Sequence, residues 1–235
     1  MDRFPTPDSC ANAPLSAVLQ LWAGLGYHRR AEALHRAARI IRDEFAGRVP
    51  GDVAQLRQLP GVGEYTAHAV ASFAFGRPVA VLDTNVGRVL ARGVANRVLG
   101  RTEAQLMAQE LLPRRGVANF NQAMIDLGAQ FCRSTPSCEQ CPVNHVCRWR
   151  NHPGPDPASG SAGVSRPQSK FEGSTRQLRG QVLAELRRSS RGPIHLRSLL
   201  EGVDRLRLDG VLNGLLRDGL IERRGRVVQL ATAPE

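Results

Sequence analysis

Hydrophobic residues recur every three or four positions from Leu15 to Phe131, the period expected of helices that bury one face. Turns are marked by glycine and proline, as at Gly24–Gly26. No convincing alternation of polar and apolar residues occurs before residue 150, so we expect this part to be all-helical. The helices expected are two within 15–46, then 53–59, 64–75, one through Val86 and Leu90 capped by Asp83 or Thr84, 103–112 and 119–131.

The pattern changes after residue 150. Residues 151–169 are rich in Pro, Gly and Ser and carry almost no large apolar residues, so we predict a linker over 151–172. Beyond it, a capping box at Ser174 and Gln177 opens a helix, and two further helices are expected over 196–203 and through Leu208 to Leu216. A hairpin over 220–230 follows. Three helices and a hairpin predict a small winged-helix-like domain over 173–235.

Composition supports a globular protein that binds a polyanion. The 235 residues, 42% of them hydrophobic, suffice for one medium domain and a small one. Lys and Arg number 32 against 21 Asp and Glu, a formal net charge of +11. If arginine merely replaced lysine on a solvent-exposed surface, this would explain why the cationic residues are arginines. It would not explain why cationic residues outnumber acidic ones. The charge therefore favours a nucleic-acid partner.

The cysteines indicate a metal site. The N-terminal residues lack a signal peptide, and no apolar run approaches the roughly 18 residues of a membrane span, so we expect a cytoplasmic protein with no membrane contact. Thiols there stay reduced. Four of the five cysteines, Cys132, Cys138, Cys141 and Cys147, have the spacing C-x5-C-x2-C-x5-C. This spacing alone fits zinc and an iron–sulfur cluster equally well.

A second motif combines a glycine-pinned turn with an acidic residue. Leu59, Gly61, Val62 and Gly63 lie in the sequence LPGVG, and glycines there allow helix-start amides to point outward and hold a phosphate. Twenty positions after Gly63 comes Asp83. A carboxylate at a helix N-terminus is favoured as the anion. Read separately, the turn could be an ordinary tight helix turn and the aspartate a purely structural cap.

Together, these segments resemble the MutY family of adenine DNA glycosylases, within the helix-hairpin-helix superfamily that includes endonuclease III. The matching segments are LPGVGEYTAHAVASFAFGRPVAVLD at 59–83, LWAGLGYHRRAEALHRAA at 21–38, VLDTNVGRVLAR at 81–92 and FNQAMIDLGAQFC at 120–132. The resemblance covers roughly residues 4–150. It implies a mainly helical glycosylase domain over 1–150 with a cysteine loop, in which the hairpin at 59–63 grips DNA and a base is flipped out of the duplex.

The resemblance also assigns roles to residues at the site. Asp83 would stabilise the positive charge that builds on the deoxyribose when the glycosidic bond breaks, with Tyr65 and Asn85 in support. Relatives that also cut the strand carry a lysine where this chain has Tyr65. The only lysine here is Lys170. The resemblance therefore implies a monofunctional, monomeric glycosylase that removes adenine opposite 8-oxoguanine or guanine in duplex DNA.

For the cysteines, the resemblance favours a [4Fe-4S] cluster over zinc. The first gap is one residue shorter than is usual in the family, which makes Cys132 the least certain of the four ligands. The family also begins with a helical segment bearing a catalytic glutamate, and this chain is expected to lack that segment. Its C-terminal part is smaller than the family's lesion-reading domain.

Two other functions stay open at this point. One is a DNA-binding homologue with impaired catalysis, because no residue here takes over the role of that glutamate. The other is a mismatch glycosylase that acts on thymine or uracil opposite guanine, because such an enzyme also tolerates Tyr65.

Overall fold

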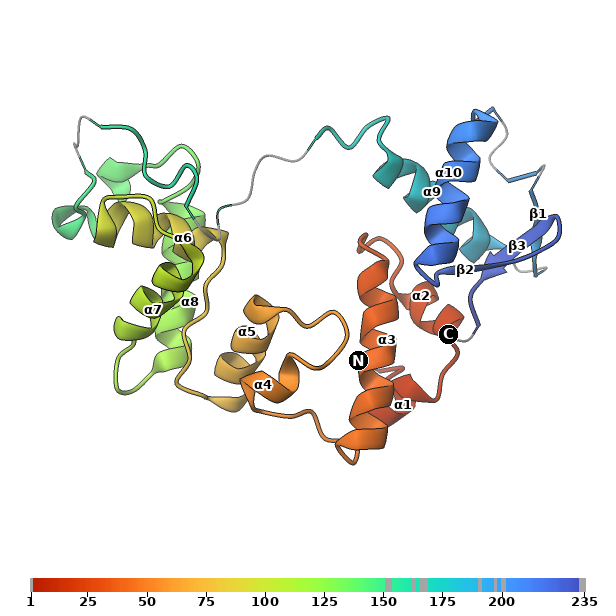
Figure 1. Ribbon diagram of the computed structural model, residues 1–235, viewed down its shortest axis with the longest axis horizontal. Coiled ribbons are helices and arrows are strands. Elements are labelled where there is room, and N and C mark those ends of the chain that lie inside the picture. The colour runs from red at the N-terminus through yellow and green to blue at the C-terminus, as the bar shows by residue number, and fades with distance from the viewer. Residues whose placement is uncertain are drawn as a thin grey trace. The chain divides into compact units, whose positions relative to one another are not determined.

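The computed structural model describes residues 2–150, 154–161, 164, 169–189, 192–196, 198–199 and 202–232. Packing divides the chain into two compact units (Figure 1). The first unit comprises residues 1–50, 59–61 and 168–235, and the second comprises 51–58 and 62–167. These divisions differ from the predicted boundaries at 150 and 172, because helices from the two ends of the chain share one core.

The first unit contains five helices and a three-stranded antiparallel sheet of order β1-β3-β2 among its described residues. Strands β2 and β3 form the predicted hairpin, with Ile221 paired to Leu230. The elements are α1 (Pro7–Ala11), α2 (Leu15–Leu21), α3 (Arg29–Glu44), α9 (Thr175–Arg188), β1 (Ile194–His195), α10 (Arg205–Arg217), β2 (Ile221–Arg224) and β3 (Val227–Leu230).

One hydrophobic core joins the N-terminal and C-terminal segments of this unit. Leu15 and Leu19 of α2 are buried together with Val182 of α9 and Leu215 of α10. A backbone hydrogen bond of 3.2 Å from the Leu15 N–H to the Thr232 carbonyl ties the two ends of the chain together. Burial of this apolar surface is what unites the segments into one unit.

Two local predictions for the first unit need correction. The helix expected over 196–203 is not formed by the described residues of that stretch, which are turn or bend, while residues 197, 200 and 201 lie outside the described ranges. Just before it, Ile194 and His195 pair with β3 instead. Helix α1 was not predicted, although its capping box is visible in the sequence: Thr6 and Ser9 exchange side-chain and backbone hydrogen bonds.

The second unit is helical throughout its regular structure. Helix α5 has the predicted bounds, whereas α4 ends at Leu56 and not at Leu59. The mainly helical fold class is confirmed. The elements are α4 (Val53–Leu56), α5 (Glu64–Phe75), α6 (Thr84–Val89), the π-helix η1 (Leu90–Ala95), α7 (Arg101–Glu110), α8 (Val117–Gln130) and the short 3-10 helices η2 (Cys138–Gln140) and η3 (Asn144–Val146). Within the described ranges, no helix is both long and apolar enough to cross a membrane.

Part of the predicted linker belongs to the second unit and is packed within it. Arg92 in η1 is only 1% exposed, and its guanidinium donates two hydrogen bonds of 2.8 and 2.5 Å to the Asp156 carboxylate. Nearby, Ala158 and Ser161 are buried, and the Ser161 hydroxyl accepts a bond from the Leu99 N–H at 3.1 Å. A buried arginine needs a counter-ion, so Asp156 anchors this segment. Residues 151–153, 162–163 and 165–168 of the predicted linker lie outside the described ranges.

This ion pair predicts a specific loss of stability. We expect Asp156→Asn to lower the free energy of unfolding by about 2 kcal/mol. This value lies between the cost of breaking an exposed ion pair and the cost of breaking a fully buried one. The hydrogen bond from Arg92 lowers the pKa of Asp156 below its ordinary value of 3.8. The stabilisation is therefore full above that ordinary value and disappears as the pH falls through the lowered pKa. Urea unfolding of both proteins across this pH range measures the difference.

The matched control is Asp43→Asn, which breaks the exposed ion pair between Asp43 and Arg42. We expect it to change the stability by less than about 0.5 kcal/mol. Equal losses in the two variants would contradict the anchoring role of Asp156.

Candidate functional site

An extended segment, residues 79–82, leads into the site and is held by polar side chains. The Asn121 side chain of α8 accepts from the Val81 N–H at 3.2 Å and donates to the Val79 carbonyl at 2.9 Å. Gln109 of α7 accepts from the Ala80 N–H at 2.9 Å, and His68 lies 2.8 Å from the Ala80 carbonyl. These side-chain hydrogen bonds satisfy backbone groups that are not paired with a neighbouring strand. They also fix the position at which the segment ends.

Asp83 follows this segment and caps α6. One carboxylate oxygen accepts from the Val86 N–H at 2.8 Å, which is the predicted helix cap. The other accepts from the side-chain amide of Asn85 at 2.8 Å. With both oxygens bonded, the carboxylate has a fixed orientation at the positive end of a helix.

Arg88 holds Asn85 in turn and connects it to the cysteine loop. Its guanidinium donates to the Asn85 side-chain oxygen at 2.7 Å, to the Gly128 carbonyl at 2.9 Å and to the Cys132 carbonyl at 2.6 Å. Gly128 permits the close approach of α6 and α8, because a Cβ there would lie 2.5 Å from the Asn85 carbonyl oxygen. A continuous chain of hydrogen bonds therefore runs from Asp83 through Asn85 and Arg88 to the Cys132 carbonyl.

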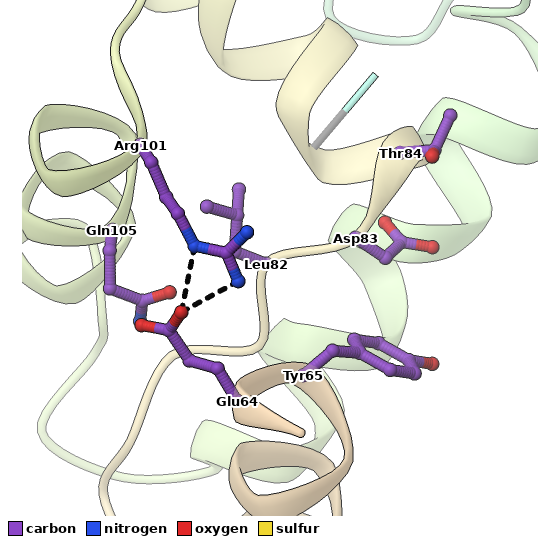
Figure 2. A pocket seen from close by; sticks show the side chains of 7 residues that line it. All are labelled: Glu64, Tyr65, Leu82, Asp83, Thr84, Arg101 and Gln105. Carbon is purple, nitrogen blue, oxygen red and sulfur yellow. Dashed lines mark hydrogen bonds and ion pairs between the residues drawn. The ribbon is translucent and has the colours of Figure 1, made fainter. Parts of the chain in front are cut away.

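The Asp83 pocket, a cavity of about 290 Å³, opens beside this carboxylate. Figure 2 shows Asp83 and Tyr65 on one side of it and an ion pair between Glu64 and Arg101 on the other. Tyr65, from the first turn of α5, is 48% exposed. The residues lining it are Glu64, Tyr65, Leu82, Asp83, Thr84, Arg101 and Gln105.

Two carboxylates line the pocket, and their surroundings differ. The hydrogen bond from Arg101 holds the pKa of Glu64 below its usual range, with further lowering by nearby His68 and Arg57. Glu64 is thus an anion at neutral pH and a poor proton donor. The two groups that donate to Asp83 in the described part of the chain, the Asn85 amide and the Val86 N–H, are both neutral, so its negative charge is available to a ligand in the pocket.

The hairpin residues predicted to bind DNA, Leu59 and residues 61–63, lie in the turn between α4 and α5. Leu59 is buried. Gly61 has φ of +74°, and a Cβ there would lie 2.6 Å from the Ala33 Cβ, so glycine is required on two grounds. Gly63 has φ of −84° and open space around it, so the expected special backbone angle applies to Gly61 alone. Val62 is half-buried and Gly63 is exposed. No side chain caps the first turn of α5.

The four clustered cysteines line one cavity of about 30 Å³, together with Arg92 and Trp149. None forms a disulfide. Burial raises the pKa of the Cys132 thiol, opposed by a hydrogen bond from Arg92. No group of three or more Cys, His, Asp or Glu side chains in the described part of the chain is arranged to hold a metal ion.

The surroundings of the cysteines nevertheless fit an electron-rich group. The indole N–H of Trp149 is buried and finds no acceptor among the described residues. The Arg92 guanidinium lies 3.4 Å from the Cys132 sulfur and 5.2 Å from the Trp149 ring centroid. Four thiols, a buried N–H donor and a guanidinium form a donor set suited to an anionic sulfur-ligated centre.

Sequence reasoning missed three residues that position the site. Arg88, Asn121 and Gly128 are buried, and their hydrogen bonds or close contacts fix Asp83 and the segment before it. A polar residue within an apolar helical pattern was the only signal for Arg88 and Asn121. Gly128 lay inside a matched segment without an assigned role.

Comparison with known proteins identifies relatives of this chain. Residues 1–113 match the model of the HhH-GPD superfamily base excision DNA repair protein. The chain is 40% identical over 231 residues to the adenine DNA glycosylase of Mycolicibacterium smegmatis, covering 95% of this chain and 76% of that one. It is 43% identical over 157 residues to human adenine DNA glycosylase, covering 64% of this chain and 29% of that one.

Solved structures of the same superfamily are also similar. A thermostable thymine-DNA glycosylase aligns with a TM-score of 0.58 and 28% identity, covering 63% of this chain and 71% of that one. A trapped endonuclease III–DNA covalent intermediate aligns with a TM-score of 0.54 and 30% identity, with the same coverage. The sequence identity over nearly the whole chain decides the assignment: this protein belongs to the adenine DNA glycosylase family, within the helix-hairpin-helix superfamily of base excision repair proteins.

Proposed function

We propose that this protein hydrolyses the N-glycosidic bond of adenine paired with 8-oxoguanine or guanine in duplex DNA. The observation that carries the proposal is the doubly bonded Asp83 carboxylate beside a 290 Å³ cavity. The identity to adenine DNA glycosylases supports adenine as the base. Asp83, Tyr65 and Asn85 are the proposed catalytic group and its supports.

The proposed chemistry follows from charge. When the bond between C1′ of the deoxyribose and the base breaks, the electron pair leaves with the base and the sugar becomes electron-poor. A fixed carboxylate beside the sugar stabilises this cation-like transition state. Water then adds to C1′, and a proton goes to the departing base. Glu64 is not the proton donor, because Arg101 keeps it ionised.

The reaction is proposed to stop at an abasic site. Strand cleavage by this superfamily needs a lysine amine that attacks C1′ and forms a Schiff base. Tyr65 occupies that position, and the residues lining the Asp83 pocket include no lysine. The protein is therefore proposed to be a monofunctional glycosylase that acts as a monomer in the cytoplasm.

The hairpin is proposed to hold the DNA backbone. Leu59, Gly61, Val62 and Gly63 lead into α5, a twelve-residue helix whose first turn has no side-chain cap. Its free N–H groups can bind one phosphate, and the missing side chain at Gly63 leaves room for the strand to approach. Together with Asp83 of the same unit, the first turn of α5 suits a nucleotide that has been flipped out of the duplex.

Cys132, Cys138, Cys141 and Cys147 are proposed to hold a [4Fe-4S] cluster. The thiols line one cavity, and Trp149 and Arg92 provide donors toward sulfur. When bound, the cluster would fix the fold of the loop by cross-linking four points of it. Because Arg88 and Arg92 both bond to the Cys132 carbonyl, ordering this loop would also support Asn85 and Asp83.

The function is tested by base release. We expect the purified protein to release free adenine from duplexes containing adenine opposite 8-oxoguanine or guanine, without strand cleavage until alkali is added. Asp83→Asn should slow release at saturating enzyme at least about 100-fold, because a fixed charge at the transition state is lost. Asparagine is an equally good helix cap, so the fold should persist. Chromatography of the released base measures both rates.

The exposed variant Asp43→Asn is the control and should react at the wild-type rate. A thymine-specific glycosylase is the second candidate, favoured by the similarity to a thymine-DNA glycosylase. Release of thymine from a G:T duplex, with no adenine from either mismatch, would replace the proposed substrate. Tight binding with no release of any base would favour the catalytically impaired homologue.

The metal assignment has its own test. Protein purified without oxygen should contain about four iron atoms and a similar amount of acid-labile sulfide per chain. Cys141→Ser should lose most of the iron and lower the melting temperature. Cys10→Ser changes the one cysteine outside the loop and should keep the iron. One zinc ion per chain in place of iron would contradict the assignment.

A further inference from the structure

Trp149 lies two residues after the last cysteine of the loop and lines the same cavity as the four thiols. Its indole N–H is buried, and among the described residues it has no hydrogen-bond acceptor. The one other buried side-chain atom in this condition in the described part of the chain is the His35 Nδ1 of the first unit. Leaving a buried donor without an acceptor is costly, so a ligand or a water ordinarily supplies the acceptor at such a place.

The Trp149 ring is held in position beside the cavity. The Arg92 guanidinium lies over it, 5.2 Å from the ring centroid, in a cation–π contact. Arg92 is itself fixed by its two hydrogen bonds to the Asp156 carboxylate. The N–H of Arg148, the residue before the indole, donates to the Gly93 carbonyl of η1 at 3.1 Å. The ring is therefore anchored through its face and through its backbone.

The lining of the cavity leaves few acceptors for the indole. Its side chains offer the four cysteine sulfurs and the oxygen of Asn144, whose amide is turned toward the Cys138 carbonyl and donates to it at 3.4 Å. A cavity of about 30 Å³ has room for one water, but a water needs two to four polar partners, and the guanidinium and the indole are donors only. An acceptor that comes with the group held by the thiols fits this donor better.

We propose that the Trp149 N–H donates a hydrogen bond to a sulfur atom of the [4Fe-4S] cluster, and that this bond raises the reduction potential of the cluster and helps to retain it. Hydrogen bonds to the sulfurs are among the factors that set such potentials. The bond is stronger when the sulfur carries more negative charge, so it stabilises the state with one more electron. This inference rests on the cluster of the proposed function and not on its base or its DNA substrate.

Voltammetry of the full chain, purified without oxygen and free of DNA, tests the bond. We expect Trp149→Phe to lower the equilibrium constant for adding one electron roughly tenfold, because the donor to sulfur is lost. For a one-electron couple, that factor equals a potential about 59 mV lower. The electron comes from the electrode, so no other reactant is needed.

Trp22→Phe is the matched control, because it makes the same substitution at the other tryptophan of the chain. The Trp22 N–H lies in the first unit and already donates to the Gly26 carbonyl at 2.8 Å. This variant should keep the potential of the wild type. An equal shift in the two variants would overturn the proposal.

A second replacement separates the hydrogen bond from packing, since phenylalanine is smaller than tryptophan. In the Trp22→Phe protein, Trp149 is the only tryptophan. Cells that cannot make tryptophan, supplied with benzothienylalanine, would therefore replace the N–H by a sulfur atom at this position alone and keep the fused ring. We expect the potential to fall as it does in Trp149→Phe.

The protein with this ring analogue decides between the two causes. A potential equal to that of Trp22→Phe would overturn the proposal, even if Trp149→Phe were shifted, because packing would then be the cause. Loss of iron from the analogue protein, with iron kept in Trp22→Phe, would support it, because the two proteins differ only in the N–H. One zinc ion per chain in place of iron would overturn it together with the metal assignment.

Failure of this proposal is distinguishable from failure of the proposed glycosylase. The potential is measured without DNA and does not depend on base release. If the wild type released no base while the potential fell in Trp149→Phe, the glycosylase assignment would fall and the role of Trp149 would stand. If adenine were released and the potential of both altered proteins equalled that of the control, the reverse would hold.

Discussion

The candidate site depends on the fixed orientation of one carboxylate, that of Asp83. Asp83 ends an extended segment that has no strand partner, and both of its oxygens are bonded, one to the α6 backbone and one to Asn85. Arg88 keeps the Asn85 amide turned toward Asp83. A charge held in this way needs no reorganisation when a cation forms beside it, which is the condition for strong electrostatic catalysis.

The same hydrogen bonds connect the site to the cysteine loop. Arg88 and Arg92 leave the chain one helical turn apart, in α6 and η1, and both reach the Cys132 carbonyl. Arg92 also forms an ion pair with Asp156. This ion pair holds the segment around Asp156, which has few apolar residues, in the second unit. Buried arginines thus replace hydrophobic contacts where α6, α8 and the loop meet. Any group that orders the loop will also act on the orientation of Asn85.

Sequence patterns predicted much of the fold because its helices carry local signals. Glu64–Phe75 has a glycine at each end, and Asp83 precedes an apolar face, so their boundaries follow from short-range chemistry. The pattern showed that α2 and α3 each have an apolar face. It did not show that α9 and α10 cover that face, because the period of apolar residues in one helix does not indicate which other helices pack against it. The described residues of 196–203 form turns and bends in place of the expected helix, and just before them β1 pairs with β3, a non-local contact that periodicity does not predict.

The candidate site was predictable only in part. Asp83, Asn85 and Tyr65 were predicted through their motifs, and the structure places Asp83 and Tyr65 at one pocket with Asn85 bonded to Asp83. Arg88 and Asn121 act from within helices whose polar residues ordinarily face water. The rate of adenine release by Asn85→Leu at saturating enzyme tests the fixation of Asp83 most directly. We expect a rate at least about tenfold below the wild type, with DNA affinity unchanged, because the carboxylate loses its orienting donor. A wild-type rate would contradict it.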